Sequence, residues 1–140
     1  MVKKKHCLKN NVVVSPQHRV YYLSETYEGS IHDITIVKEE GWQFPEGIVL
    51  YQDTGFQGHA PDNVVVMQPL KKPKGKELTE EQKSKNKQIS SVRVKVEHTI
   101  GEIKIFRIVK DTIRNWKYGF KDLIMEICCG LQNFKIAFVT

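Results

Sequence analysis

The sequence contains little cysteine, and its spacing argues against a metal centre built from thiolates. There are three cysteines, Cys7 and the adjacent pair Cys128 and Cys129. Zinc sites are commonly built from Cys-x-x-Cys pairs, and the sequence has none. Adjacent cysteines are also poorly placed to bridge each other. We therefore interpret the cysteines as small buried hydrophobes of a protein kept in a reducing compartment.

Long apolar runs and nucleotide-binding glycine loops are missing as well. No apolar run approaches the roughly 18 residues that a transmembrane helix needs. The basic N-terminus is followed by the polar residues Lys9, Asn10 and Asn11, not by the apolar stretch of a signal peptide. No loop of the Walker or Rossmann type occurs, and no spacing supports a Ser-His-Asp or Cys-His pair. The sequence therefore predicts a protein that is not secreted and has no membrane partner.

Positive charge, in contrast, is in excess. The 140 residues carry a formal net charge of +6, and the isoelectric point is about 9.2. A hydrophobic fraction of 40% suits a globular chain, and the length predicts a single domain over residues 1–140. Each Lys or Arg near a phosphate releases counterions, so this excess suits a polyanionic partner. Many basic proteins never bind nucleic acid, so charge alone shifts the balance only slightly.

The pattern of residues predicts an α/β fold. Val12 to Val14 and the run from Val20 are rich in β-branched residues and flank a turn at residues 15–18, which predicts an antiparallel hairpin. The predicted order is strand, strand, helix, strand, strand, helix, helix, typical of a mixed sheet with helices. These elements cover Cys7–Val14, Val20–Ser24, Ile31–Glu40, Ile48–Tyr51, Val64–Met67, a helix from Thr79 to about Phe106, and Tyr118–Phe134.

The ends of the helices carry recognisable signals. Ser30 or Asp33 is expected to cap the first helix and Gly41 to end it, with Ile34 and Val37 on its buried face. Thr79 and Gln82 have the spacing of a capping box at the start of the second helix. The last helix repeats apolar residues at helical spacing, which predicts a buried stripe. Its members are Phe120, Leu123, Ile124, Ile127, Cys128 and Leu131.

Asp53 follows a short apolar strand and precedes Gly55 and Gly58. The run Ile48–Tyr51 predicts a strand buried on both faces. Ligand sites of α/β sheets gather at the carboxyl ends of strands, and glycines let backbone approach a ligand closely. Position alone favours a second interpretation, in which the Asp53 side chain only makes an Asx turn.

A charged pattern also occurs in the second predicted helix. Arg93, Glu97, Gly101 and Lys104 fall on one helical face, with the small Gly101 leaving room for a ligand. The alternative is a solvated face with ordinary charge pairing. Residues 91–96 would also alternate well as a strand, and periodicity does not decide between the two.

Together these elements resemble the DDE superfamily of transposase endonucleases, of the insertion sequence 5 and Harbinger type. The resemblance covers nearly the whole chain, and its elements occur in the family's order. The matching elements are Lys3–His6, Gly29–Asp33, Asp53–Gly58, Arg93 with Glu97 and Lys104, and Cys129–Asn133.

The resemblance implies a ribonuclease-H-like mixed sheet with flanking helices, and cleavage and strand transfer of DNA. It implies two Mg²⁺ (or Mn²⁺) ions held by carboxylates, with Asp53 as the second acidic ligand and Glu97 as the third. Lys104 would contact a DNA phosphate, and Arg93 would orient Glu97 or bind phosphate. For Asp33 we favour a capping role over metal binding.

Two departures from the family pattern matter. Ser90 stands where the signature often has Tyr. The first catalytic Asp lies upstream of the Lys3–His6 element, so no residue of this chain matches it. The expected fold therefore lacks its first strand, which would lie between the Cys7–Val14 and Ile48–Tyr51 strands. These two strands would keep unpaired edges or pair with each other directly. We expect the chain alone to be inactive, and either marginally stable or associated with other molecules through its unpaired edges.

Two rival interpretations remain open. In one, the chain is a non-catalytic basic remnant that grips DNA phosphates through Lys71, Lys72 and Lys74. In the other, the motifs match by chance and the protein binds no nucleic acid. For the DDE interpretation the expected partners are DNA and either a second copy or an upstream transposase fragment. The expected location is the bacterial cytoplasm, at the nucleoid, or the nucleus of a eukaryote.

Overall fold

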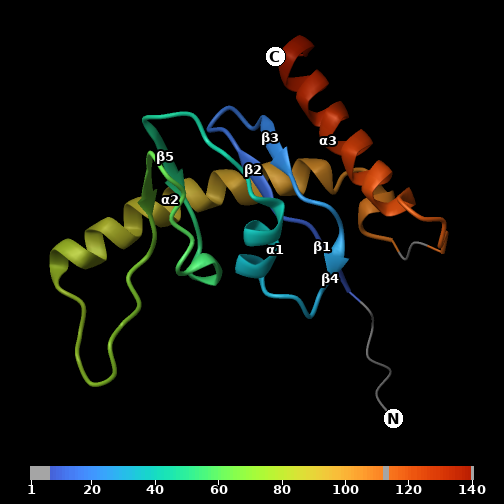
Figure 1. The fold of residues 1–140 in the computed structure, drawn as a ribbon. Coiled ribbons are helices and arrows are strands. Elements are labelled where there is room, and N and C mark those ends of the chain that lie inside the picture. Colours follow the sequence, from blue (N-terminus) through green and yellow to red (C-terminus); the bar gives the residue numbers. More distant parts are fainter. Residues whose placement is uncertain (1–6, 112–113, 140) are drawn as a thin grey trace. The chain divides into compact units, whose positions relative to one another are not determined.

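The computed structural model describes residues 7–111 and 114–139, in which short strands and three α-helices alternate (Figure 1). The chain divides into two compact units. The first combines the described residues of 1–31 and 96–140, and the second consists of residues 32–95. The Lys3–His6 element lies outside the described residues. Within the described part, no helix is long and apolar enough to cross a membrane.

The first unit begins with the predicted hairpin, which is confirmed. β2 (Val12–Val14) pairs antiparallel with β3 (Val20–Leu23). The turn closes with a hydrogen bond from the Ser15 N–H to the Arg19 carbonyl at 2.8 Å, and His18 adopts a left-handed φ of 66°. The predicted first strand is divided, because β1 (Leu8–Lys9) is separate and pairs with β4 (Tyr27–Glu28), which was not predicted.

The side chains of Asn10 and Ser24 account for the interruption between β1 and β2. The Asn10 amide donates to the Ser24 carbonyl at 3.2 Å and to the Thr26 hydroxyl at 3.0 Å. The Asn11 N–H donates to the Ser24 hydroxyl at 2.8 Å. These bonds take the place of regular ladder bonds, since side chains here offer the backbone another partner.

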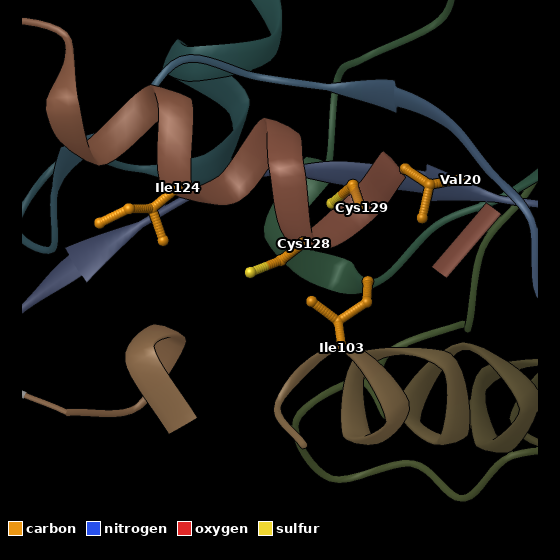
Figure 2. Packing of buried hydrophobic residues seen from close by; sticks show 5 residues of the cluster. All are labelled: Val20, Ile103, Ile124, Cys128 and Cys129. Atoms are coloured by element: carbon orange, nitrogen blue, oxygen red, sulfur yellow. The ribbon is translucent and has the colours of Figure 1, made fainter. Parts of the chain in front are cut away.

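α3 (Phe120–Phe138) packs against β3 in the same unit. Ile124, Cys128 and Cys129 belong to one buried cluster with Val20 of β3 and Ile103 (Figure 2). The predicted stripe is therefore right for Ile124 and Cys128. It is wrong for a second set, which is about half exposed: Leu123, Ile127 and Leu131.

Polar residues explain why α3 turns a different face inward. The Val20 N–H donates to Asn133 Oδ1 at 2.7 Å, and Asn133 Nδ2 donates back to the Val20 carbonyl at 2.8 Å. The Thr26 N–H donates to Asp122 Oδ1 at 2.6 Å. Gln132, only 2% exposed, donates to Glu102 and to the His18 carbonyl. These bonds satisfy backbone groups of the hairpin that would otherwise lack partners, and they fix the rotation of the helix.

The second unit contains α1 (Asp33–Glu40) and a parallel strand pair. α1 ends as predicted at Gly41, whose φ is 60° and whose N–H bonds the Val37 carbonyl at 3.1 Å. The predicted cap is wrong, because His32 occupies the N-cap position and makes no side-chain cap bond. The fully buried residue of α1 is Ile36, and its neighbour Val37 is also buried.

β5 (Ile48–Tyr51) runs parallel to β6 (Val64–Met67), with Ile48 opposite Val64 and Tyr51 opposite Met67. The prediction that β5 is buried on both faces is wrong. Its residues alternate, and Val49 and Tyr51 are 48% and 43% exposed. Because β6 is its one strand partner among the described residues, β5 has too few neighbours to bury both faces.

α2 (Glu80–Ile103) is a single helix of 24 residues, and the short 3-10 helix η2 (Arg107–Val109) follows it. The capping box is confirmed: Thr79 N–H donates to Gln82 Oε1 at 3.0 Å, and Gln82 N–H donates to Thr79 Oγ1 at 3.3 Å. Residues 91–96 are helical, so the alternating strand alternative is wrong.

The strands of the described chain do not form the single mixed sheet that we predicted. They form three two-stranded sheets, β1 with β4, β2 with β3, and β5 with β6. Direct pairing of β2 with β5, one of the two expected outcomes, does not occur in the described part. The other outcome holds, since β2 and β5 each keep one edge without a strand partner there.

Candidate metal and nucleic-acid site

Asp53 lies directly beyond β5, where the chain turns into the 3-10 helix η1 (Thr54–Phe56). Its Oδ1 accepts the Thr54 N–H at 2.7 Å, which caps that helix. The Gln68 amide donates to the Asp53 carbonyl at 2.8 Å and holds the backbone at this point. The Asp53 side chain therefore bonds the N–H of the next residue and not the N–H two residues on that an Asx turn uses, and this bond engages only one carboxylate oxygen.

The second oxygen of Asp53 faces Arg93. Arg93 Nη2 lies 3.6 Å from Asp53 Oδ2, and the two side chains are 58% and 45% exposed. An ion pair this open to solvent contributes little to stability, about 0–1 kcal/mol. Its value is positional, because it places a guanidinium from α2 beside a carboxylate at a strand end. Sequence reasoning had paired Arg93 with Glu97 or phosphate, not with Asp53.

Asp33 approaches the same loop from α1. A Cβ added at Gly55 would lie 3.3 Å from Asp33 Oδ2, tighter than most real contacts of this kind. Glycine at position 55 therefore lets the η1 backbone lie close to the Asp33 carboxylate. Gly58 has a left-handed φ of 91°, which favours glycine at the end of this loop.

The side chains of Gln52 and His59 form hydrogen bonds within the loop that follows β5. The Gln52 amide donates to the Phe56 and His59 carbonyls at 3.3 and 3.0 Å, and its Oε1 lies 3.2 Å from His59 Nδ1. Burial, and secondarily the positive charge of Lys38, lowers the pKa of His59. A neutral His59 can both donate and accept within this arrangement, and the loop that carries Asp53 is thereby ordered.

Glu97 follows Arg93 by one helical turn on α2 and is exposed. Gly101 is exposed too, and a Cβ added there would meet nothing within 4 Å. Lys104 lies just past the end of α2, with its N–H still bonded to the Ile100 carbonyl at 3.0 Å. Glu97, the exposed Gly101 and Lys104 thus follow one another along the C-terminal end of α2.

Lys71, Lys72 and Lys74 lie in the exposed loop between β6 and α2. Lys72 pairs loosely with Glu77 at 3.7 Å. The loop is anchored to α2 by Asn86, whose Oδ1 accepts the Leu70 N–H at 2.9 Å and whose Nδ2 donates to the Leu70 carbonyl at 3.1 Å. This anchor sets where the lysines leave the helix, and sequence reasoning did not identify it.

The carboxylates of this region are suitable ligands for a hard divalent cation such as Mg²⁺, but they are few. Mg²⁺ is commonly bound through one or two carboxylates together with water and substrate phosphate, and both Asp53 and Glu97 offer exposed carboxylates. Over residues 7–111 and 114–139, no group of three or more His, Cys, Asp or Glu side chains is arranged to hold a metal.

Comparison with known proteins gives two matches. Residues 1–133 match the family model described as DDE superfamily endonuclease. The chain is 33% identical over 132 residues to a protein from Microchaete diplosiphon named "Probable transposase for insertion sequence element IS702". That alignment covers 94% of this chain and 48% of the relative, so the chain spans about half the relative's length. No solved structure matches the chain.

Proposed function

Because the chain belongs to the DDE superfamily endonuclease family, we propose that its 140 residues contribute part of a transposase catalytic centre that cleaves and joins DNA. The observation that carries this proposal is the position of Asp53. It stands at the carboxyl end of a parallel strand, beside a glycine-containing turn, with Arg93 on one of its oxygens. Ligand sites of α/β sheets gather at such strand ends.

We assign Asp53 and Glu97 as the two acidic metal ligands that this chain supplies. Bound Mg²⁺ or Mn²⁺ would activate the attacking hydroxyl and stabilise the leaving oxygen. Arg93 balances the charge of Asp53 and lies close enough to exchange that contact for a phosphate oxygen, to which its planar group is equally suited. Asp33 supports the Asp53 loop through Gly55 instead of binding metal.

The lysines would bind the DNA backbone. Lys104, just beyond α2, and Lys71, Lys72 and Lys74, in the anchored loop, are all exposed. Exposed lysines bind phosphates without reading base sequence, so they would position DNA and not select it.

The fold that we propose is ribonuclease-H-like. The antiparallel β2–β3 pair and the parallel β5–β6 pair support it, since both pairings occur in that fold. In the proposed order, a strand from outside these residues pairs with β2 on one side and β5 on the other, and it brings the first catalytic Asp. We further propose residues 1–140 as a single domain once that strand is in place.

Cleavage of labelled duplex DNA with Mg²⁺ or Mn²⁺ tests the proposal. The chain is assayed alone and with an N-terminal extension that restores a strand and its Asp. We expect cutting only by the extended form, and Glu97→Gln should abolish it. Glu81→Gln, an exposed change on the same helix, is the matched control and should leave cutting intact. Cutting that survives Glu97→Gln would refute the assignment of Glu97.

One observation favours a second candidate, a basic DNA-binding module without catalysis. The lysine loop is anchored to α2 by Asn86, and this anchor involves none of the proposed metal ligands. A pure binder would hold DNA equally in EDTA, and Glu97→Gln would not change its affinity. Replacing Lys71, Lys72 and Lys74 together with Gln would weaken it and flatten its salt dependence.

A further inference from the structure

The face of α3 that points away from the hairpin is apolar along nearly its whole length. Five large side chains on it are between 45% and 73% exposed. At 100° per residue they fall within an arc of roughly 80°, so they form one stripe. We refer to this set as the α3 stripe: Leu123, Ile127, Leu131, Phe134 and Phe138. The rings of its last two members already touch, with centroids 4.7 Å apart.

α3 cannot bury the stripe by rotating. The rest of its circumference carries Ile124, at the edge of the stripe, and Cys128 and Cys129, farther round the helix, and all three are buried (Figure 2). Asn133 is bonded twice to the Val20 backbone, and Asp122 accepts the Thr26 N–H. Rotation would break these bonds and expose the buried face. The outward position of the stripe is therefore a fixed feature of the first unit.

The stripe is large enough to matter. Five half-exposed Leu, Ile and Phe side chains offer roughly 500 Å² of apolar surface, comparable to the largest patch on a typical monomer, which is often functional. Covered by an equal surface, they would bury about 1,000 Å² in total, the lower limit for a specific protein interface. A second copy of this chain meets that requirement with no other component.

The spacing of the α3 stripe suits pairing with the α3 stripe of a second copy of this chain. Its positions are symmetric about the point between Gly130 and Leu131, so that Leu123 mirrors Phe138 and Ile127 mirrors Phe134. In an antiparallel pair of α3 helices, each member of the stripe then lies level with its mirror residue. A Cβ at Gly130 would meet nothing within 4 Å, so the helices have open space to approach closely at the centre.

We propose that α3 pairs antiparallel with α3 of a second copy of this chain, through the α3 stripe and about a two-fold axis at Gly130 and Leu131. Such an interface is isologous, as expected for a symmetric dimer. It goes beyond the proposed DNA chemistry, because none of the residues assigned to that site lies on α3.

Sedimentation of the full chain over a concentration series tests the dimer. We expect a monomer–dimer equilibrium with a midpoint in the micromolar range, and Ile127→Glu should shift it at least tenfold toward monomer. Val94→Glu is the matched control: Val94 is a helical residue of similar exposure, 48% against 52%, outside the stripe. It should leave the midpoint unchanged. A wild-type chain that stays monomeric at 100 times that concentration would overturn the proposal, as would equal effects of the two variants.

Disulfide trapping tests the register, and it also decides the matter if Ile127→Glu fails to fold. In a Cys7→Ser background, Leu131→Cys should cross-link to its own copy, since its two positions are about 1.5 Å apart along the helix axis. Leu123→Cys should not, because its copies are about 22 Å apart, but it should cross-link to Phe138→Cys in a mixture. Trapping of Leu123→Cys to itself, or no trapping of Leu131→Cys, would refute the antiparallel pair.

Discussion

Replacing Asn133 gives a quantitative test of how much its bonds to the hairpin contribute to the free energy of unfolding. Its side chain accepts the Val20 N–H and donates to the Val20 carbonyl, at 2.7 and 2.8 Å. Val20 is only 7% exposed. In Asn133→Ala both backbone groups would lose their partner in a place that water reaches poorly. Leaving a buried group unsatisfied costs about 1–3 kcal/mol, so we expect a loss of roughly 2–4 kcal/mol in the free energy of unfolding.

The chain contains a matched control for this change. Asn86 makes the same pair of bonds with the Leu70 backbone, at 2.9 and 3.1 Å, but Leu70 is 47% exposed. In Asn86→Ala water can replace the lost partner, and the expected loss is about 0.5–1 kcal/mol.

Urea unfolding followed by circular dichroism measures both losses. The slope with denaturant should stay constant between variants, which shows that the comparison concerns stability alone. Asn133→Asp keeps the acceptor and loses the donor, so it should fall between wild type and Asn133→Ala. Equal losses for Asn133→Ala and Asn86→Ala would refute the reasoning, because they would mean that burial does not set the cost.

Three further predictions concern thiols, a helix cap and pH. Burial raises the pKa of the Cys128 thiol, and it raises the pKa of the Cys129 thiol to about 11. At pH 8 the thiolate fraction of Cys129 is then over ~100-fold below that of an ordinary cysteine. A thiol reagent should therefore modify exposed Cys7 rapidly and the adjacent pair only in denaturant. Rapid modification of all three would contradict this burial. Thr79→Ala removes one bond of the capping box and should lower stability by about 1 kcal/mol, seen as a shifted urea midpoint; no shift would mean that the end of α2 is frayed in solution. The pKa of His59 in the folded chain lies below its usual 6.5, so as the pH falls the unfolded chain binds a proton at His59 before the folded chain does. The free energy of unfolding is therefore unaffected by His59 above pH 6.5 and decreases below it. His59→Gln should remove this contribution to the pH dependence of the melting temperature.

Local signals were predicted well from the sequence. The β2–β3 hairpin, the capping box at Thr79 and the left-handed Gly41 at the end of α1 all depend on a few adjacent residues. The N-cap of α1 was the exception, since His32 occupies a position for which Ser30 or Asp33 was expected. Burial was predicted less well, because it depends on how many neighbours an element finds. β5 has one strand partner among the described residues, so its apolar run alternates instead of being buried throughout.

The candidate site shows the same division. The place of Asp53 at a strand end and the shared helix of Arg93 and Glu97 follow from local pattern. The contact of Arg93 with Asp53 joins residues 40 positions apart in the chain, and no periodicity carries that information. The approach of Asp33 to Gly55 is equally non-local. Their roles toward metal and DNA stay predictions until the cleavage assay is made.

The polar anchors of α3 have a consequence for how this protein tolerates mutation. Apolar packing accepts many side chains of similar volume. In contrast, Asn133 bonds the Val20 backbone of the hairpin and Asp122 accepts the N–H of Thr26, which follows the hairpin, each with defined donor or acceptor positions. Asn133 and Asp122 therefore specify the orientation of the helix. The buried thiols and Ile124 contribute mainly the stabilisation that comes from burying apolar surface. A saturation library of α3 should consequently show its narrowest tolerance at two partly exposed polar positions, where a hydropathy profile alone would suggest freedom.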